Sequence, residues 1–157
     1  MFYGMNAWFL ATLATGALWW VAGAAHPAWM RLPPRAAAQA YVSSWSRGGP
    51  ALAVLALGAA GLGVAAAFAE PDPKWALGSA FMASAFVFTI VAMGAPGHKL
   101  RDLAKAPDQG VREAAQEGAQ EGAGGEALSV LRLWGRLHLI RSILASIGVF
   151  FFIWAAH

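Results

Sequence analysis

Four apolar stretches, each long enough to cross a lipid bilayer, limit the fold of this chain more than any other feature. They cover residues 6–25, 50–69, 75–95 and 131–156. A helix needs about 20 apolar residues to cross the ~30 Å of bilayer hydrocarbon. Charged residues make up only 12% of the 157 residues, about half of their share in a soluble domain. We therefore predict an all-α membrane protein, a single integral membrane domain over residues 1–157 that folds as a four-helix antiparallel transmembrane bundle.

The first apolar stretch is expected to stay in the mature protein as a membrane span. No Lys or Arg precedes it, and its apolar part is as long as a full span, whereas a secretory signal has a basic start and a shorter apolar core. The lipid bilayer is therefore the expected partner of all four stretches. The sequence leaves open whether the protein forms a homo-oligomer.

The basic residues are distributed unevenly between the loops. Lys74 is the only one between the second and third stretches, whereas the other two loops and their borders hold Arg31, Arg35, Arg47, Lys99, Arg101, Lys105, Arg112, Arg132 and Arg136. Because basic loops stay in the cytoplasm, we expect these two loops to be cytoplasmic and both termini to lie outside, in a bacterial inner membrane. The basic residues form no Lys/Arg block with interleaved aromatics, so nucleic acid is not an expected partner.

The connection after the first span carries proline signals. Pro33 and Pro34 precede the alanine-rich residues 35–43, and proline is favoured at the first position of a helix. This pattern predicts a short interfacial helix after span one that starts near Pro34. The large aromatic residues of this segment are assigned to a headgroup-level aromatic belt: Trp29, Tyr41 and Trp45.

The connection between the third and fourth spans has two parts. Gly94 and Gly97 flank Pro96, which predicts a helix break at the cytoplasmic end of span three. Residues 99–128 are then predicted to form a soluble loop, because their Glu, Gln, Gly and Ala tract has no large apolar residue to bury.

The last span carries ionisable residues on one helical face. The spacing of three and four residues places six side chains in one stripe: Trp134, His138, Arg141, Ala145, Gly148 and Phe152. The opposite face is bulky and apolar, which favours contact with lipid. An arginine in a span costs about 2.5–3.5 kcal/mol of insertion free energy, so such residues usually face the bundle interior and mark function. His138 and Arg141 are therefore the first candidate site residues.

The first and third spans show similar stripes that also end in histidine. The stripe of the first span contains Thr12, Thr15, Trp19, Ala22 and His26. The stripe of the third span contains Ser84, Phe88, Val91, Ala95 and His98. If these faces turn inward, His26, His98 and His138 meet in the cytoplasmic third of the bundle, with Arg141 one turn deeper. We therefore predict that the His138 ring lies within reach of His98 or His26.

Three uses of this group remain open. A neutral histidine, His138 or His98, acts as a general base, and Arg141 stabilises the anion that forms. Alternatively His26, His98 and His138 bind haem iron or a transition metal, or these side chains only hydrogen-bond neighbouring helices. The metal alternative lacks an H-x-x-x-H pair and a carboxylate within a span. No cysteine is present, which excludes thiolate chemistry.

At three places the sequence resembles a family of small four-span membrane proteins that includes the anthrone oxygenases of aromatic polyketide pathways. The segment HPAWMRLPPRAAAQA is similar to the end of the family's first span, and GAPGHKL to the end of its third. The spacing of Trp134, His138 and Arg141 matches the start of its last span. Two departures stand out. Gly94 and His98 replace the two asparagines of the family's third-span motif, and His26 stands where methionine is usual.

The resemblance implies an oxygenase-like reaction on a hydrophobic, aromatic small molecule. His138 would be the base and Arg141 the oxyanion partner. The aromatic residues that would stack on the substrate ring are Trp134 with Trp19 or Phe88. The alternative function is a non-enzymatic membrane protein, such as an accessory subunit or a lipophile-binding module. Whether a cofactor is needed stays open between none, haem and a transition metal.

Overall fold

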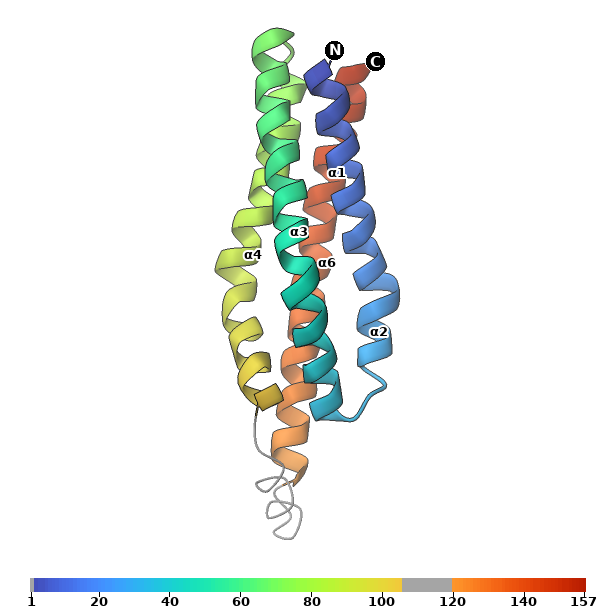
Figure 1. Ribbon diagram of the computed structural model, residues 1–157, viewed down its shortest axis with the longest axis vertical. Coiled ribbons are helices and arrows are strands. Elements are labelled where there is room, and N and C mark those ends of the chain that lie inside the picture. The colour runs from blue at the N-terminus through green and yellow to red at the C-terminus, as the bar shows by residue number, and fades with distance from the viewer. Residues whose placement is uncertain (1, 106–119) are drawn as a thin grey trace.

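The computed structural model describes residues 2–105 and 120–157, with side chains from residue 125 onward in the last helix. In this part of the chain, four helical rods run antiparallel, and both termini lie at the same end as the turn between the second and third rods (Figure 1). The first rod consists of α1 (Phe2–Trp20), the π-helical turn η1 (Val21–Ala25) and α2 (His26–Trp29), and the others are α3 (Pro34–Ala69), α4 (Pro73–Lys105) and α6 (Gln120–Ala156). Each rod is long and apolar enough to cross a membrane, which confirms the predicted all-α bundle.

Two of the predicted interruptions are absent from the helices. The short interfacial helix expected after span one is the first part of α3, which starts at Pro34 and continues through Pro50 to Ala69. Similarly, α4 continues through Pro96 to Lys105. Proline is tolerated inside a membrane helix when neighbouring helices pack around the freed backbone groups. The predicted breaks were therefore wrong.

The predicted soluble loop 99–128 is also shorter than expected. Residues 99–105 belong to α4 and residues 120–128 belong to α6. The salt bridge between Lys99 and Glu126 joins these two extensions. The rest of the predicted loop lies outside the described residues.

Small residues form the contacts between the helices. The buried face of α1 carries Gly4, Ala7, Ala11 and Ala14, and the buried face of α4 includes Gly78, Ala85 and Gly97. Between α4 and α6, a Cβ atom added at Gly78 or at Gly148 would lie 3.1 Å from the backbone oxygen of the other glycine, closer than ordinary van der Waals contact, and at Gly78 it would also collide with the ring of Phe152. Membrane helices approach most closely where such residues meet.

This packing confirms the predicted stripe of α6, bears out the stripe of the first span only in part, since Thr15 is buried and His26 half-buried, and overturns the stripe of α4. All six residues of the α6 stripe, from Trp134 to Phe152, are buried. In contrast, Thr12 and Trp19 on α1 and Val91 and His98 on α4 are exposed. The inward faces of α1 and α4 follow the small residues, because close backbone approach decides helix packing where lipid is as apolar as the side chains.

The connection between α3 and α4 is closed by Asp72. Its Oδ1 accepts a hydrogen bond of 2.9 Å from the backbone N–H of Lys74, and its Oδ2 lies 2.9 Å from Lys74 Nζ. Both contacts favour the ionised carboxylate, and they hold the pKa of Asp72 below its ordinary value. Asp72 therefore caps the N-terminus of α4 as a carboxylate.

We expect Asp72→Ala to lower the melting temperature of the detergent-purified protein at neutral pH, because it removes this cap. A carboxylate with a depressed folded-state pKa stabilises the folded state above the ordinary aspartate pKa of about 3.9, and this contribution disappears as the pH falls through the folded-state value. The difference in melting temperature from wild type should therefore shrink below about pH 4. Asp72→Asn keeps the capping oxygen and serves as the control. A difference that does not change with pH would contradict the assignment.

Candidate functional site

The centre of the candidate site is the guanidinium group of Arg141 on α6. This residue is 4% exposed. Nη1 donates to Thr89 Oγ1 at 3.0 Å, Nη2 donates to His138 Nδ1 at 3.3 Å, and the guanidinium carbon lies 5.5 Å from the ring centroid of Trp45. Nε has no hydrogen-bond partner, and no carboxylate among the described side chains forms an ion pair with Arg141. Within the described residues, the bundle therefore holds a buried positive charge whose partners are neutral groups.

His138 is neutral, and its hydrogen bonds assign its tautomer. Nε2 lies 3.0 Å from the backbone oxygen of Leu18, and a carbonyl only accepts, so Nε2 carries the proton. Arg141 only donates, so Nδ1 is the acceptor of its hydrogen bond. Both ring nitrogens are therefore occupied, and His138 has no free nitrogen to receive a proton.

A change in helix type lies beside the carbonyl that His138 uses. The π-helical turn η1 (Val21–Ala25) begins three residues after Leu18 and interrupts the α-helical hydrogen bonding of the first rod. Single π-turns within α-helices are frequent at functional sites. Here the contact ties the first rod to α6 and fixes the imidazole that holds Arg141.

Two of the three predicted histidines, His138 and His26, lie around Trp134. Its buried indole stacks with the His138 ring at 4.8 Å and with the His26 ring at 6.2 Å between centroids. His26 Nε2 donates to the backbone oxygen of Leu131 at 3.0 Å. The two imidazoles therefore share an indole but bind different carbonyls. His98 is exposed and lines a cavity to which Trp134 also contributes. Among the described residues, no group of three or more His, Cys, Asp or Glu side chains is placed to hold a metal ion.

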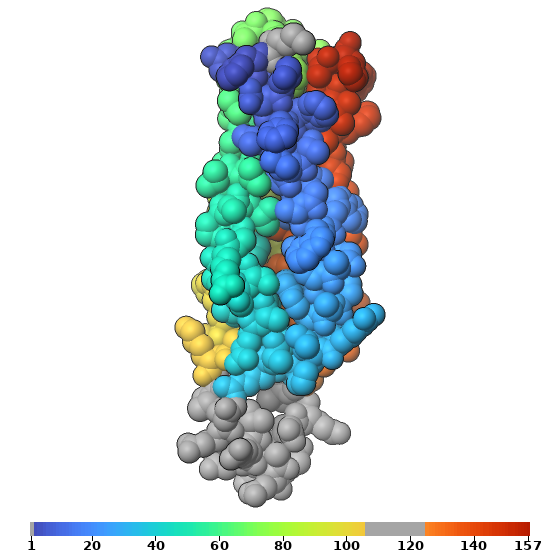
Figure 2. Space-filling view, turned by 45° about the vertical axis from the view of Figure 1, so that its right-hand side comes forward, coloured from blue at the N-terminus to red at the C-terminus, as the bar shows by residue number. Residues whose placement is uncertain are grey.

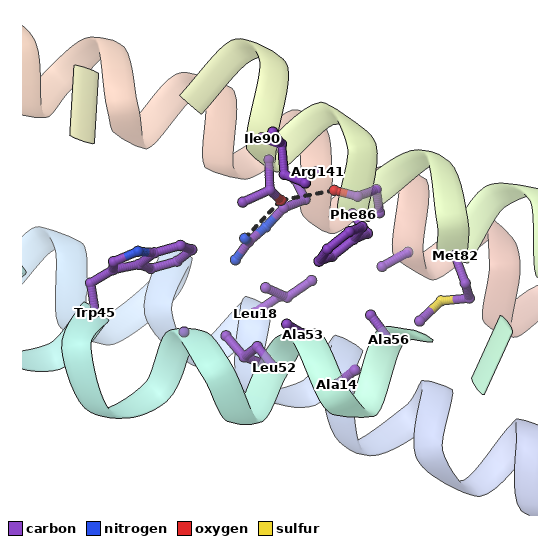
Figure 3. Close-up of a pocket in the computed structure, with 14 residues that line it drawn as sticks. Ala14, Leu18, Trp45, Leu52, Ala53, Ala56, Met82, Phe86, Ile90 and Arg141 are labelled. Carbon is purple, nitrogen blue, oxygen red and sulfur yellow. Dashed lines mark hydrogen bonds between the residues drawn. The ribbon is translucent and has the colours of Figure 1, made fainter. Parts of the chain in front are cut away.

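A largely apolar cavity of about 180 Å³ lies next to Arg141, and we call it the inner cavity. Arg141 and Thr89 supply its polar atoms, and Figure 3 shows the hydrogen bond between them together with the apolar side chains around it. The surface is hollowed between α1 and α3 (Figure 2), the two helices that supply Leu18 and Leu52. The principal lining residues are Ala14, Leu18, Trp45, Leu52, Ala56, Met82, Phe86, Thr89, Ile90 and Arg141.

A second cavity of about 250 Å³, the outer cavity, lies toward the basic end of the bundle. It shares Trp45, Thr89 and Ile90 with the inner cavity, so the two cavities are neighbours that adjoin at these side chains. The outer cavity is more polar, since His98 and Arg101 contribute to its lining. Its other lining residues are Tyr41, Met93, Gly94, Gly97 and Trp134.

The structure places the three aromatic residues that were predicted to stack on a substrate ring in different surroundings. Trp134 lines the outer cavity. Trp19 is 44% exposed and donates to Ser146 Oγ at 2.9 Å. Phe88 packs against the buried cluster that contains Tyr41, Met93 and Trp134. The phenylalanine that lines the inner cavity is Phe86, two residues earlier on α4. Trp19 and Phe88 lie away from the inner cavity because α1 and α4 turn their small residues, and not the predicted stripes, toward the bundle interior.

Sequence reasoning missed Trp45, Tyr41, Thr89 and Arg101. The expected headgroup belt was wrong, because Tyr41 is 2% exposed and its ring lies 5.0 Å from that of Trp134. The available signal was the spacing of four residues from Ala37 through Tyr41 to Trp45, which continues the buried face of α3. Thr89 and Arg101 carried no comparable signal, since they lie outside the stripe predicted for α4.

Comparison of the chain with protein families, with curated proteins and with solved structures finds no match. The resemblance to the anthrone oxygenase family therefore stays a prediction.

Proposed function

We propose that this chain is a membrane-embedded protein that binds a lipophilic aromatic molecule and stabilises its anion at Arg141. The observation that carries the proposal is a buried arginine, with no carboxylate partner among the described side chains, at the edge of an apolar cavity. A fixed positive charge in a medium of low dielectric stabilises a developing oxyanion strongly. Arg141 also has an unpaired Nε–H, so it retains a donor after its contacts with Thr89 and His138.

The reaction that fits this site is an oxygenase-like oxidation of an anthrone-type substrate, as the family resemblance implies. The acidic ring C–H loses its proton to a base, and the electron pair is delocalised onto the ring oxygen beside Arg141. The resulting carbanion forms a C–O bond with O₂, and loss of water then gives the second carbonyl, so one anthrone and one O₂ yield one anthraquinone and one water. We assign the base to His98, because it lines the outer cavity while both nitrogens of His138 are occupied.

A lipophile-binding protein without catalysis is the second candidate. The occupied nitrogens of His138 favour it, since the residue closest to Arg141 serves as a hydrogen-bond partner and not as a base. The cavities and Arg141 have the same role in both candidates. Only the fate of the bound molecule distinguishes them.

Anthrone in aerated nanodiscs tests both candidates. Quenching of tryptophan fluorescence reports binding, while oxygen uptake and anthraquinone absorbance report turnover, with empty nanodiscs as the control for spontaneous oxidation. The enzyme proposal expects faster turnover with protein, and a loss of about 10²–10⁴-fold in rate for His98→Gln without loss of binding. Binding without turnover assigns the second candidate. Absence of binding contradicts both.

The proposed location is a bacterial inner membrane with the basic loops in the cytoplasm and both termini outside. Because the chain has no cysteine, single-cysteine variants are clean probes of sidedness. We expect a membrane-impermeant maleimide to label Asp72→Cys in intact spheroplasts, and Lys105→Cys only after the membrane is opened. Labelling of both from the same side would overturn the orientation.

A further inference from the structure

Arg101 is a cation with no ion-pair partner among the described residues, and it lies at the outer cavity. Its neighbour Lys99 pairs with Glu126 of α6. In contrast, the half-buried Arg101 forms no salt bridge in this part of the chain and lines the cavity together with His98. Lys99 and Arg101 therefore differ in their ion pairing although they lie on the same turn of α4. Of the two, Arg101 is the one whose charge stays available to a ligand.

The hydroxyl of Tyr41 adds a polar group to the same cavity. Tyr41 reaches α4 at Gly97, where even one added carbon atom would collide with its hydroxyl oxygen. Glycine at this position therefore makes room for the hydroxyl in the cavity lining. Arginine and hydroxyl donors together are typical of sites that bind carboxylate or phosphate oxygens.

The depth of Arg101 along α4 is that of lipid headgroups. A helix rises 1.5 Å per residue, so Thr89 lies about 24 Å and Arg101 about 42 Å from Pro73 at the start of α4. Bilayer hydrocarbon is about 30 Å thick, and the headgroup regions extend this to about 40–45 Å. Arg141, bonded to Thr89, therefore lies within the hydrocarbon, while Arg101 lies at the interface.

We propose that the outer cavity is a second anion-binding subsite, which holds the carboxylate or phosphate of an amphiphile whose apolar body extends past Arg141 into the inner cavity. Trp45, Thr89 and Ile90 line both cavities, so a single elongated molecule that passes between these side chains would reach both. This inference rests on the proposed function for the occupation of the inner cavity. It adds that the natural ligand is a lipophilic acid with its anionic group at the membrane surface.

The test uses the full chain in phosphatidylcholine nanodiscs with two matched probes, 12-bromododecanoic acid and 12-bromododecanol. Bromine quenches tryptophan fluorescence, and Trp45 and Trp134 line the cavities. We expect wild type to prefer the acid, and Arg101→Gln to weaken acid binding about tenfold without changing binding of the alcohol. Arg101→Lys, which keeps the charge, should retain part of the preference. The exposed Arg136 on α6 supplies the control variant, Arg136→Gln, which should bind both probes as wild type does.

Competition identifies the source of the anion. Displacement of the bromo acid by dodecyl phosphate, but not by the same concentration of inorganic phosphate, supports an anion carried by an amphiphile. Equal displacement by both overturns the proposal, as does an Arg101→Gln variant that keeps the preference for the acid. Anthrone binding separates the two proposals. If Arg141→Leu leaves anthrone binding intact while Arg101→Gln removes the acid preference, the proposed function fails and the subsite stands.

Discussion

Replacement of Arg141 with leucine is expected to weaken binding of anthrone by about 10- to 100-fold, while the protein stays folded and inserted. The loss corresponds to a charge-assisted hydrogen bond, which contributes about 1.5–3 kcal/mol. The fold should tolerate the change, because an arginine costs about 2.5–3.5 kcal/mol of insertion free energy within a membrane. Thr89 Oγ1 still donates to the backbone oxygen of Ala85 and His138 Nε2 keeps its bond to Leu18, so His138 Nδ1 is the one atom of these two side chains that is left without its partner.

Fluorescence titration of wild type and Arg141→Leu in nanodiscs measures the affinity, and the melting temperature in detergent reports the fold. Arg136→Leu removes an exposed arginine from the same helix and should bind anthrone as wild type does. Suppose instead that Arg141→Leu misfolds and wild type binds no lipophile. Arg141 would then be a structural link between α4 and α6, and the proposed function would lose its main support.

Trp134→Ala is expected to destabilise the bundle by about 3–5 kcal/mol, the usual cost of truncating a large buried aromatic residue. The side chain is 1% exposed. Its ring lies within 4.8–6.3 Å, between centroids, of five other rings: His26, Trp29, Tyr41, Trp45 and His138. These rings come from α2, α3 and α6, so the loss should loosen the basic half of the bundle and the outer cavity together.

The measurement is unfolding of the purified protein in mixed micelles of dodecyl maltoside and sodium dodecyl sulfate. Trp20→Ala is the control, because this tryptophan is 65% exposed on α1 and its loss should change the free energy of unfolding little. Similar destabilisation by both variants would show that aromatic area matters wherever it lies. It would contradict a special role of the cluster around Trp134.

Hydrogen bonding leads to different roles for the candidate histidines. His138 and His26 each donate to a helix carbonyl, whereas His98 lies at the outer cavity. A residue's identity and spacing do not show whether its nitrogens are already engaged. The hydrogen bond from His138 to Leu18 joins residues 120 positions apart in the chain, so no local pattern could have predicted it.

The four-span bundle and the inward face of α6 were readable from the amino acids alone. Both depend on local properties, namely the length of apolar stretches and a polar stripe that lipid does not tolerate. The faces of α1 and α4 were not readable in this way. Polar side chains such as Thr12 and Ser84 satisfy themselves by bonding to carbonyls of their own helices, so they can face lipid. Small residues then set the helix rotation, and the rotation of α4 brought Thr89 and Arg101 to the cavities near Arg141.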